Sequence, residues 1–268
     1  MPEELSTNGS KERSENDNEI PITDNFHESF NTAAYLQDFY TRIDDPAMQM
    51  VVLFLPNIVQ RLDEFESLLD FGAGPTVHVA AIFRNKAKNI YLADYLAQNR
   101  QELYHWLNGT SKFDWTETFK KIASVEGHDW QELKSIESLT RSKVKGIFHC
   151  DCHQADSVKA PENLKCNFDV VSTVFCIEYS SRTTEEYQNA VKNVVSHVKP
   201  GGLFVMGGVF EETWCSFGGK KFPCFYLTEE LLFATLRDCG LLIDDPDQTI
   251  CYNINGIYLI CSRKRSNF

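Results

Sequence analysis

The chain of 268 residues is acidic, with a formal net charge of −12 and a pI near 5.1. This charge argues against a protein that follows the phosphates of nucleic acid. Hydrophobic residues make up 43% of the chain, enough for a sizeable core, but the longest apolar run, Met50 to Leu55, is too short to span a bilayer. We therefore expect a soluble, cytoplasmic and monomeric protein with neither a nucleic-acid partner nor a membrane partner.

The N-terminal region changes composition near residue 25. Residues 2–19 are rich in Glu, Ser, Asn and Lys and contain almost nothing apolar, which predicts a disordered tail over residues 1–25 and one domain over 26–268. The domain begins with a predicted helix over residues 26–40, whose aromatic face includes Tyr35 and Tyr40. A second helix over residues 47–62 leads into the first strand.

The stretch from Leu68 to Thr76 predicts a buried strand that ends in a glycine turn. Gly72 and Gly74 lack a Cβ, so a ligand can approach the backbone closely, and Pro75 suits the first turn of a helix over residues 76–83. A tight turn that binds no ligand is the alternative interpretation, because Gly-x-Gly turns are common in α/β proteins.

A second short strand, Asn89 to Asp94, ends in an acid 20 residues beyond Gly74. An aspartate at this distance can accept hydrogen bonds from both hydroxyls of a ribose. A dinucleotide site favours a third glycine facing the pyrophosphate, but this chain has Val77 there. The pattern therefore predicts S-adenosylmethionine as the cofactor rather than NAD.

Further elements continue the alternation of strands and helices. A helix over 98–107 and a helical insertion over 108–143 precede a third strand over 144–150. Asp151 follows that strand, at the sheet edge where doubly wound folds bind ligands, so it can take the adenine amino group while Cys152 offers its backbone N–H. The next apolar strand, over 168–176, is followed by Glu178, a carboxylate that is costly to bury without a use.

The C-terminal part completes an α/β pattern. We expect a helix over 184–198, a strand from residue 203 and a hairpin that turns at Gly218 and Gly219. Thr228 begins another helix, and two antiparallel strands end the chain.

Nine cysteines are scattered through the C-terminal half, mostly in apolar surroundings, which predicts reduced thiols in the core. The densest group, Cys150-Asp151-Cys152-His153, has no second Cys or His pair to complete four ligands, so we expect no metal.

The combination of motifs resembles one family: the small-molecule N-methyltransferases of phenylethanolamine, nicotinamide and indolethylamine. The run over residues 70–107, with DFGAGPT, ADY and QNRQELYHWL, carries the likeness, which extends from Phe26 to Lys264. It continues through Phe113-Asp114-Trp115, Asp129-Trp130-Gln131, Phe175-Cys176-Ile177-Glu178, Lys199-Pro200-Gly201-Gly202 and Glu211-Glu212-Thr213-Trp214.

The resemblance implies a Rossmann-like class I methyltransferase, with a seven-stranded, mostly parallel sheet, helices on both faces, an N-terminal helical lid and a hairpin that covers the substrate. Tyr35 and Tyr40 match tyrosines at the methionine end of the cofactor, and Asn99 matches a cofactor-binding asparagine. His78 stands where the family usually has a tyrosine at the cofactor carboxylate. The cofactor-binding set so implied is Tyr35, Tyr40, Gly72, Ala73, Gly74, His78, Asp94, Asn99, Asp151, Cys152 and Val174.

The resemblance also implies methyl transfer to a small amine or pyridine. Glu178 and Glu212 match catalytic glutamates that lie at the amine in the phenylethanolamine branch. The nicotinamide branch has an acid at the position of Gly208, which this chain lacks. The phenylethanolamine branch has a further acid about the position of Tyr252 and a polar residue at the position of Phe39, and this chain has neither. An arylalkylamine and nicotinamide therefore both stay open as substrates. A catalytically silent relative that binds the cofactor and acts through a partner is the alternative, because His78 and Phe39 depart from the family pattern.

Overall fold

The computed structural model describes residues 20–23 and 25–266 of the chain, and its centre is one seven-stranded sheet. The strands are β1 (Phe65–Phe71), β2 (Ala87–Asp94), β3 (Val144–His149), β4 (Phe168–Val174), β5 (Val198–Val209), β6 (Trp214–Phe217), β7 (Lys220–Pro223), β8 (Thr249–Ile254) and β9 (Ile257–Arg263). In the sheet they stand in the order β3-β2-β1-β4-β5-β9-β8, and β6 and β7 form a separate hairpin. Strands β1 to β5 are parallel, whereas β9 pairs antiparallel with β5 and β8. The antiparallel pair of β8 and β9 agrees with the sequence prediction for the last two strands.

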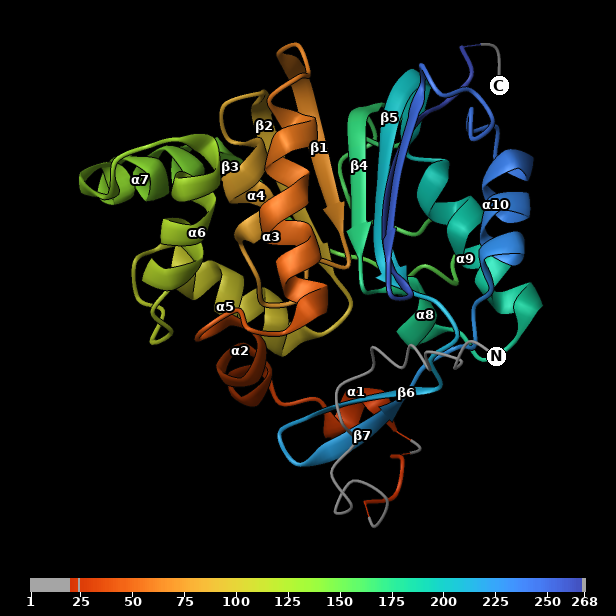
Figure 1. Cartoon of the computed structure of the whole chain (residues 1–268), viewed down its shortest axis with the longest axis horizontal. Helices are drawn as coiled ribbons and strands as arrows, with labels where there is room; N and C mark the ends of the chain where they lie inside the picture. The colour runs from red at the N-terminus through yellow and green to blue at the C-terminus, as the bar shows by residue number, and fades with distance from the viewer. Residues whose placement is uncertain (1–19, 24, 267–268) are drawn as a thin grey trace, which may run out of the picture.

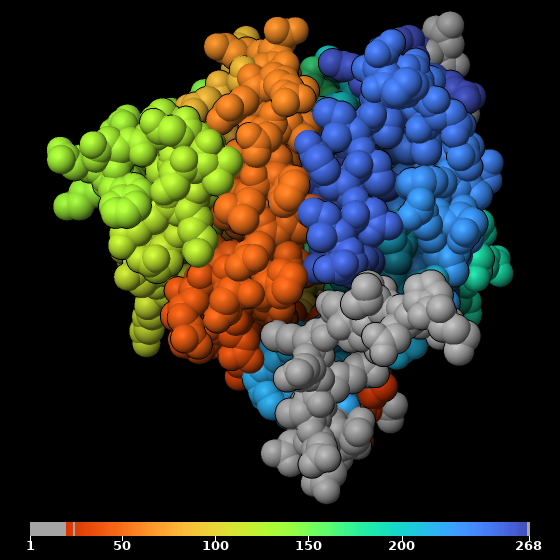
Figure 2. Space-filling view, viewed as in Figure 1, coloured from red at the N-terminus to blue at the C-terminus, as the bar shows by residue number. Residues whose placement is uncertain are grey.

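Helices cover both faces of the sheet (Figure 1). They are α1 (Phe26–Ser29), α2 (Thr32–Tyr40), α3 (Pro46–Val59), α4 (His78–Phe83), α5 (Ala97–Leu107), α6 (Thr116–Glu126), the 3₁₀ turn η2 (Trp130–Glu132), α7 (Leu133–Lys143), α8 (Ile177–Ser180), α9 (Thr184–Val195) and α10 (Glu229–Asp238). Side chains of α3 to α7 form one core against the sheet, and those of α9 and α10 form the other. Figure 2 shows α3 exposed along one side of the molecule, between α6 and the C-terminal strands.

The central strand β1 shows why the sheet needs a layer of helices on each face. Residues 67–71 are all buried, and successive side chains point to opposite faces. Leu68 enters the core under α3 and α4, whereas Leu69 and Phe71 enter the core under α9. A continuous apolar run of this kind is typical of a parallel strand covered on both sides. The strand therefore ends in a fixed position, at the edge of the sheet where the glycine turn begins.

The N-terminal segment differs from the single helix predicted over residues 26–40. It forms the two helices α1 and α2, because Asn31 caps the second one by accepting a hydrogen bond from the Ala34 N–H at 2.9 Å. The predicted disordered tail lies outside the described residues for positions 1–19 and 24. Of the residues described before α1, Ile22 forms a β-bridge with Lys221 in β7.

Several predicted boundaries are wrong by a few residues. The helix predicted over 184–198 ends at Val195, β5 begins at Val198 rather than at residue 203, and the helix predicted over 47–62 ends at Val59. Two further differences have clear local reasons. The helix expected from Thr76 begins at His78, because the Thr76 hydroxyl donates to the Ala73 carbonyl at 2.7 Å and extends the turn; Pro75 therefore lies in that turn. The strand expected to reach residue 176 ends at Val174, because Phe175 takes a φ of 50° and redirects the chain into α8. All nine cysteines are free thiols, but Cys166 and Cys251 are exposed rather than in the core.

Candidate active site

The glycine turn after β1 is fixed by close contacts on both sides. Gly72 and Gly74 have φ angles of +73° and +61°, where side chains cause strain. A Cβ at Gly72 would lie 2.1 Å from the Cys176 sulfur, so glycine is required there. The N–H groups of Gly72 and Ala73 both donate to the Ala93 carbonyl at 2.9 Å, which ties the turn to the end of β2. The backbone of this turn therefore forms a rigid floor beside Asp94.

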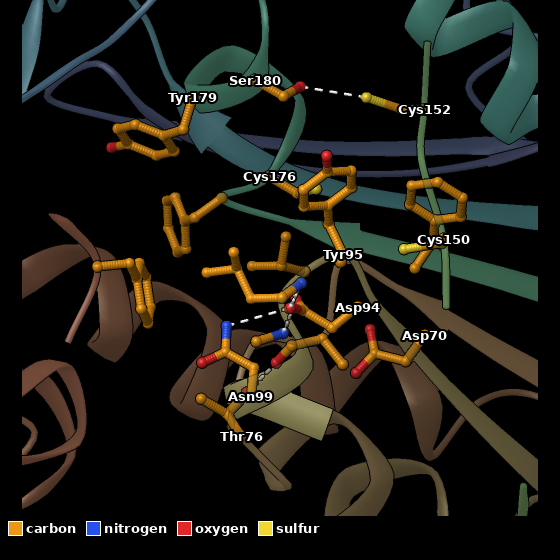
Figure 3. A pocket seen from close by; sticks show the side chains of 18 of the residues that line it. Asp70, Thr76, Asp94, Tyr95, Asn99, Cys150, Cys152, Cys176, Tyr179 and Ser180 are labelled. Carbon is orange, nitrogen blue, oxygen red and sulfur yellow. Dashed lines mark hydrogen bonds between the residues drawn. The ribbon is translucent and has the colours of Figure 1, made fainter. Parts of the chain in front are cut away.

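Asp94 is the centre of a hydrogen-bond network at the carboxyl end of β2 (Figure 3). One of its oxygens accepts from the Gly74 N–H at 2.9 Å, and the other accepts from the Leu96 N–H at 2.8 Å and from Asn99 Nδ2 at 3.1 Å. Burial raises the pKa of Asp94, and these hydrogen bonds oppose that shift. Because Oδ2 accepts only one of these bonds, it keeps a lone pair for a ligand hydroxyl.

A cavity of about 260 Å³ lies against this network. Its walls come from α1 and α2, from the glycine turn, and from the carboxyl ends of β2, β3 and β4. All eleven residues that the sequence assigns to cofactor binding line it: Tyr35, Tyr40, Gly72, Ala73, Gly74, His78, Asp94, Asn99, Asp151, Cys152 and Val174. The structure thus brings together positions that are more than 130 residues apart in the chain.

Several further residues of the cavity wall were not assigned to cofactor binding from the sequence. They are Asp70, Tyr95, Cys150, Cys176, Tyr179, Ser180 and Arg182, together with residues of α1. Tyr95 directly follows Asp94, and its ring stacks on His27 of α1 at 4.4 Å, a contact that local sequence gives no sign of. Cys152 and Ser180 approach each other across the cavity edge, with their side-chain atoms 3.2 Å apart (Figure 3).

The end of the cavity near α2 is built from aromatic side chains and a histidine. The rings of Tyr35 and Tyr40 lie 6.0 Å apart, and Tyr40 lies 5.2 Å from the ring of His78. Burial raises the pKa of both tyrosines, so their hydroxyls stay protonated at neutral pH. Burial also lowers the pKa of His78 to about 3, so its imidazole is neutral in the empty cavity.

The hairpin of β6 and β7 meets the lid helices over this end. The ring of Phe217 lies 5.2 Å from both Phe30 and Tyr35 and 5.9 Å from Phe39. The Gly218 N–H donates to Asp38 of α2 at 2.8 Å, which adds a polar link at the hairpin turn. Two segments far apart in the chain therefore form one aromatic cover.

The two predicted catalytic glutamates do not line the cavity. Glu178 is completely buried in α8, and neither carboxyl oxygen has a hydrogen-bond partner among the described residues. A Cβ added to Gly208 would lie 2.6 Å from Glu178 Oε1 and from the Tyr258 hydroxyl, so the carboxyl group fills the space that this glycine leaves. Burial raises the pKa of Glu178 to about 8. Glu212 is half-buried, between β5 and the hairpin.

These features fit S-adenosylmethionine. The buried Nδ1 of His78 has no partner among the described residues, the glycine turn presents bare backbone, and Asp94 keeps an acceptor for a ribose hydroxyl. Among the described residues that line the cavity, Arg182 is the one permanent cation. The side-chain hydrogen bond with Cys152 also raises the pKa of His153 to about 9, so this histidine is mostly protonated at neutral pH. No group of three or more metal-ligating side chains occurs within residues 20–23 and 25–266. None of the helices described is long and apolar enough to cross a membrane.

Comparison with known proteins agrees with this geometry. The model of the NNMT/PNMT/TEMT family matches residues 19–265 of the chain. The chain belongs to this family. It is 36% identical to a nicotinamide N-methyltransferase of Caenorhabditis elegans over 246 residues, which cover 88% of this chain and 90% of the relative. It is 28% identical to a phenylethanolamine N-methyltransferase of Bos taurus over 210 residues, which cover 74% of this chain and 73% of that relative.

Solved structures of other methyltransferases share the fold of this N-methyltransferase. An S-adenosylmethionine-dependent methyltransferase of Clostridium acetobutylicum superposes with a TM-score of 0.52 at 14% identity, covering 86% of this chain and 97% of that one. The CurJ carbon methyltransferase gives a TM-score of 0.55 at 11% identity, and the match covers 87% of this chain and 58% of that one. The chain is therefore an S-adenosylmethionine-dependent N-methyltransferase with a Rossmann-like fold, and nothing in these comparisons supports a catalytically silent relative.

Proposed function

We propose that this N-methyltransferase methylates the ring nitrogen of a small pyridine of the nicotinamide type. The observation that carries this choice is the position of Glu178. Its carboxyl group is fully buried against Gly208 and Tyr258, outside the cavity, and its raised pKa of about 8 leaves it mostly uncharged at neutral pH. A neutral acid in that position gives no counter-charge to an ammonium. A pyridine needs none, because its nitrogen already carries a free lone pair at pH 7.

The cover over the cavity supports an aromatic substrate. Phe217, Phe39 and Tyr35 present ring faces and edges at the meeting of hairpin and lid. Aromatic rings prefer offset or edge-to-face contacts at these separations, worth roughly 0.5–1.5 kcal/mol per pair. The 36% identity to the nicotinamide N-methyltransferase, over nine-tenths of that relative's length, favours the same substrate class.

We assign different parts of the cofactor to different residues of the cavity. S-adenosylmethionine, when bound, supplies an electrophilic methyl group on its sulfonium. We assign the ribose to Asp94 and Asn99, and the adenine to the region of Asp151 and Cys152 at the end of β3. Tyr35 and Tyr40 line the end of the cavity that we assign to the methionine group, and aromatic rings attract a cation such as the sulfonium.

The chain contributes chiefly positioning to the reaction. In-line transfer needs donor and acceptor atoms about 3–3.5 Å apart in a site without water, which can supply roughly 7–11 kcal/mol of the barrier. We assign the exclusion of water to the aromatic cover of lid and hairpin, in which Phe217 packs on Phe30 and Tyr35. No general base is required for a pyridine, since its nitrogen has no proton to lose.

An arylalkylamine is the second candidate substrate, favoured by the sequence Glu211-Glu212-Thr213-Trp214 on the approach to the hairpin. An aliphatic ammonium must lose a proton before it can accept a methyl group, and a glutamate beside it would lower the cost of holding its charge near a sulfonium. This role would require Glu178 or Glu212 to reach the substrate when the hairpin moves.

The experiment is methyl transfer from labelled S-adenosylmethionine to nicotinamide and to a panel of arylalkylamines. We expect label in N-methylnicotinamide, and the loss of both activity and cofactor binding in Asp94→Ala. Asp244→Ala, in an exposed ion pair with Arg237, is the matched control and should behave like wild type. Transfer to amines alone would favour the second candidate, and NAD binding in place of S-adenosylmethionine would overturn both.

A further inference from the structure

His78 is a buried, unsatisfied and neutral base in the wall of the cofactor cavity. Its side chain is only 4% exposed, and Nδ1 has no hydrogen-bond partner among the described residues. The ring lies beside Tyr40 at 5.2 Å with an interplanar angle of 35°, so an aromatic neighbour restricts its orientation. A buried polar nitrogen without a partner costs stability, which makes His78 the least satisfied polar group at this end of the cavity.

The groups that face His78 offer little positive charge. Tyr35 and Tyr40 come from α2, Asp70 from β1 and Asp94 from β2, and all four line the same cavity. Carboxyl and phenol groups are neutral when protonated and negative when ionised, so none of these four can supply a positive charge. Burial raises the pKa of Asp70 to about 8 and raises the pKa values of the other three, which favours their neutral forms.

The permanent cation of the cavity wall, Arg182, belongs to its other end. It lies close enough to His27 to lower the pKa of that residue, and Asp151 and His153 act on His27 as well. A cofactor with its ribose on Asp94 and its adenine near Asp151 places its amino-acid end near His78. The cofactor carboxylate therefore meets acids, tyrosine hydroxyls, backbone and one side chain that can become positive.

We propose that His78 takes up a proton when S-adenosylmethionine binds and holds the cofactor carboxylate as an imidazolium. This inference rests on the proposed function, since it assumes that the cavity binds this cofactor. The proton comes from solvent and is bound by the imidazole, and no other bond is formed or broken. The buried carboxylate removes the cost of burying a charged imidazole alone, because an opposite charge at contact distance favours the protonated form.

The sign of the pH dependence follows from this linkage. In the free chain His78 is neutral above about pH 3, whereas in the complex its pKa is higher. Binding then consumes a proton at every pH between these two pKa values, and affinity falls by up to about tenfold per pH unit across that window. A tyrosine, which the family usually has at this position, would not titrate between these two pKa values.

The test compares two ligands and two chains. S-adenosylmethionine carries the carboxylate, and decarboxylated S-adenosylmethionine keeps the ammonium and the sulfonium but lacks it. Calorimetry of each ligand in two buffers with different ionisation enthalpies counts the protons taken up. His78→Gln keeps a hydrogen-bond donor without a titrating group. It therefore separates the effect of His78 from that of Asp70, which can release its proton to solvent when either cationic ligand binds, in wild type and variant alike.

We expect wild type to take up more protons with S-adenosylmethionine than with the decarboxylated ligand at pH 6, and His78→Gln to abolish that difference. The ratio of the variant's Kd to the wild-type Kd should fall about fivefold or more from pH 6 to pH 8. Equal proton uptake with both ligands on wild type would overturn the inference, even if the variant does not fold. Binding of neither ligand would instead overturn the proposed function, and this inference with it.

Discussion

The side-chain amide of Asn99 links the lid helix α2 to Asp94, using its nitrogen for one contact and its oxygen for the other. Its Nδ2 donates to Asp94 Oδ1 at 3.1 Å, while its Oδ1 accepts from the Thr32 hydroxyl at 2.8 Å. Thr32 is the first residue of α2, and Asp94 is the last residue of β2. One buried side chain therefore couples the start of the lid helix to the carboxylate that we assign to the ribose.

Thr32→Val should weaken cofactor binding, because it removes the donor to Asn99 Oδ1 and loosens the partner of Asp94. The net loss of one hydrogen bond is about 1 kcal/mol, which corresponds to roughly a fivefold rise in Kd for S-adenosylmethionine. Titration calorimetry measures it. Thr184→Val, on an exposed helix start, is the control. An unchanged Kd in Thr32→Val would show that α2 does not affect cofactor binding through Asn99.

Gly72→Ala should destabilise the fold, because its Cβ would lie 2.1 Å from the Cys176 sulfur at a φ of +73°. Gly109→Ala is a matched control: Gly109 has a φ of +71°, but a Cβ there meets nothing within 4 Å. We expect the control to lose about 1 kcal/mol and Gly72→Ala to lose clearly more. Thermal or urea unfolding measures both.

The double variant Gly72→Ala/Cys176→Gly separates the clash from the backbone strain. Removing the Cys176 side chain should recover part of the loss, leaving mainly the strain seen in Gly109→Ala. If the double variant were no more stable than the sum of the two single changes, the clash with Cys176 would not be the cause.

Glu212→Gln should distinguish the two substrate classes. For an aliphatic amine we expect kcat/KM to fall by about tenfold or more, since one unbalanced charge in a dry site costs over about 1.4 kcal/mol. Methylation of nicotinamide should change far less and stay nearly flat over the pH range in which the amine reaction rises. Steady-state rates of wild type and variant with both substrates decide this. Equal losses for amine and pyridine would mean that the glutamate only shapes the site.

His197 should make the fold less stable in mild acid. It is 2% exposed, its Nε2 lies 2.7 Å from the Ser157 hydroxyl, and its Nδ1 accepts from the Cys166 N–H at 3.4 Å. Burial lowers its pKa to about 4 from 6.5, so the folded state favours the neutral ring. This stability is complete above pH 6.5 and is lost as pH falls toward 4, by up to about 1.4 kcal/mol per pH unit.

Urea unfolding from pH 7 to pH 5 tests this acid sensitivity. His197→Asn should show a shallower loss of unfolding free energy than wild type over that range, because it cannot take up a proton. His105→Asn, on an exposed part of α5, should keep the wild-type slope. A wild-type slope in His197→Asn would assign the acid sensitivity to other groups.

The order of strands and helices follows from the sequence because each strand is a short apolar run that ends at a polar or glycine turn. Asp94 and Asp151 could be assigned for this reason: each follows such a run, and the carboxyl ends of parallel strands meet at one edge of the sheet. Tyr35, His78 and Asn99 are instead implied by the resemblance to the family, and all eleven residues of the cofactor set line one cavity.

The surroundings of Glu178 could not be predicted in the same way. The sequence places this acid after a buried strand, but the φ of 50° at Phe175 turns the chain and sends the side chain toward β5. The space it fills exists because Gly208, on the neighbouring strand, has no side chain, and only the pairing of β4 with β5 brings the two together. The break at Asn31 was missed for a related reason: its capping bond competes with a helical pattern that runs through it.

Phe217 sets a limit on how freely this enzyme can be redesigned. Its ring packs on Phe30, Tyr35 and Phe39, so the hairpin that we expect to cover the substrate also supports α2, whose tyrosines line the cavity. A hairpin grafted from a relative to change the accepted base would replace these contacts as well. Such a chimaera would also need α2 from the same relative. The hairpin and α2 should therefore be exchanged together.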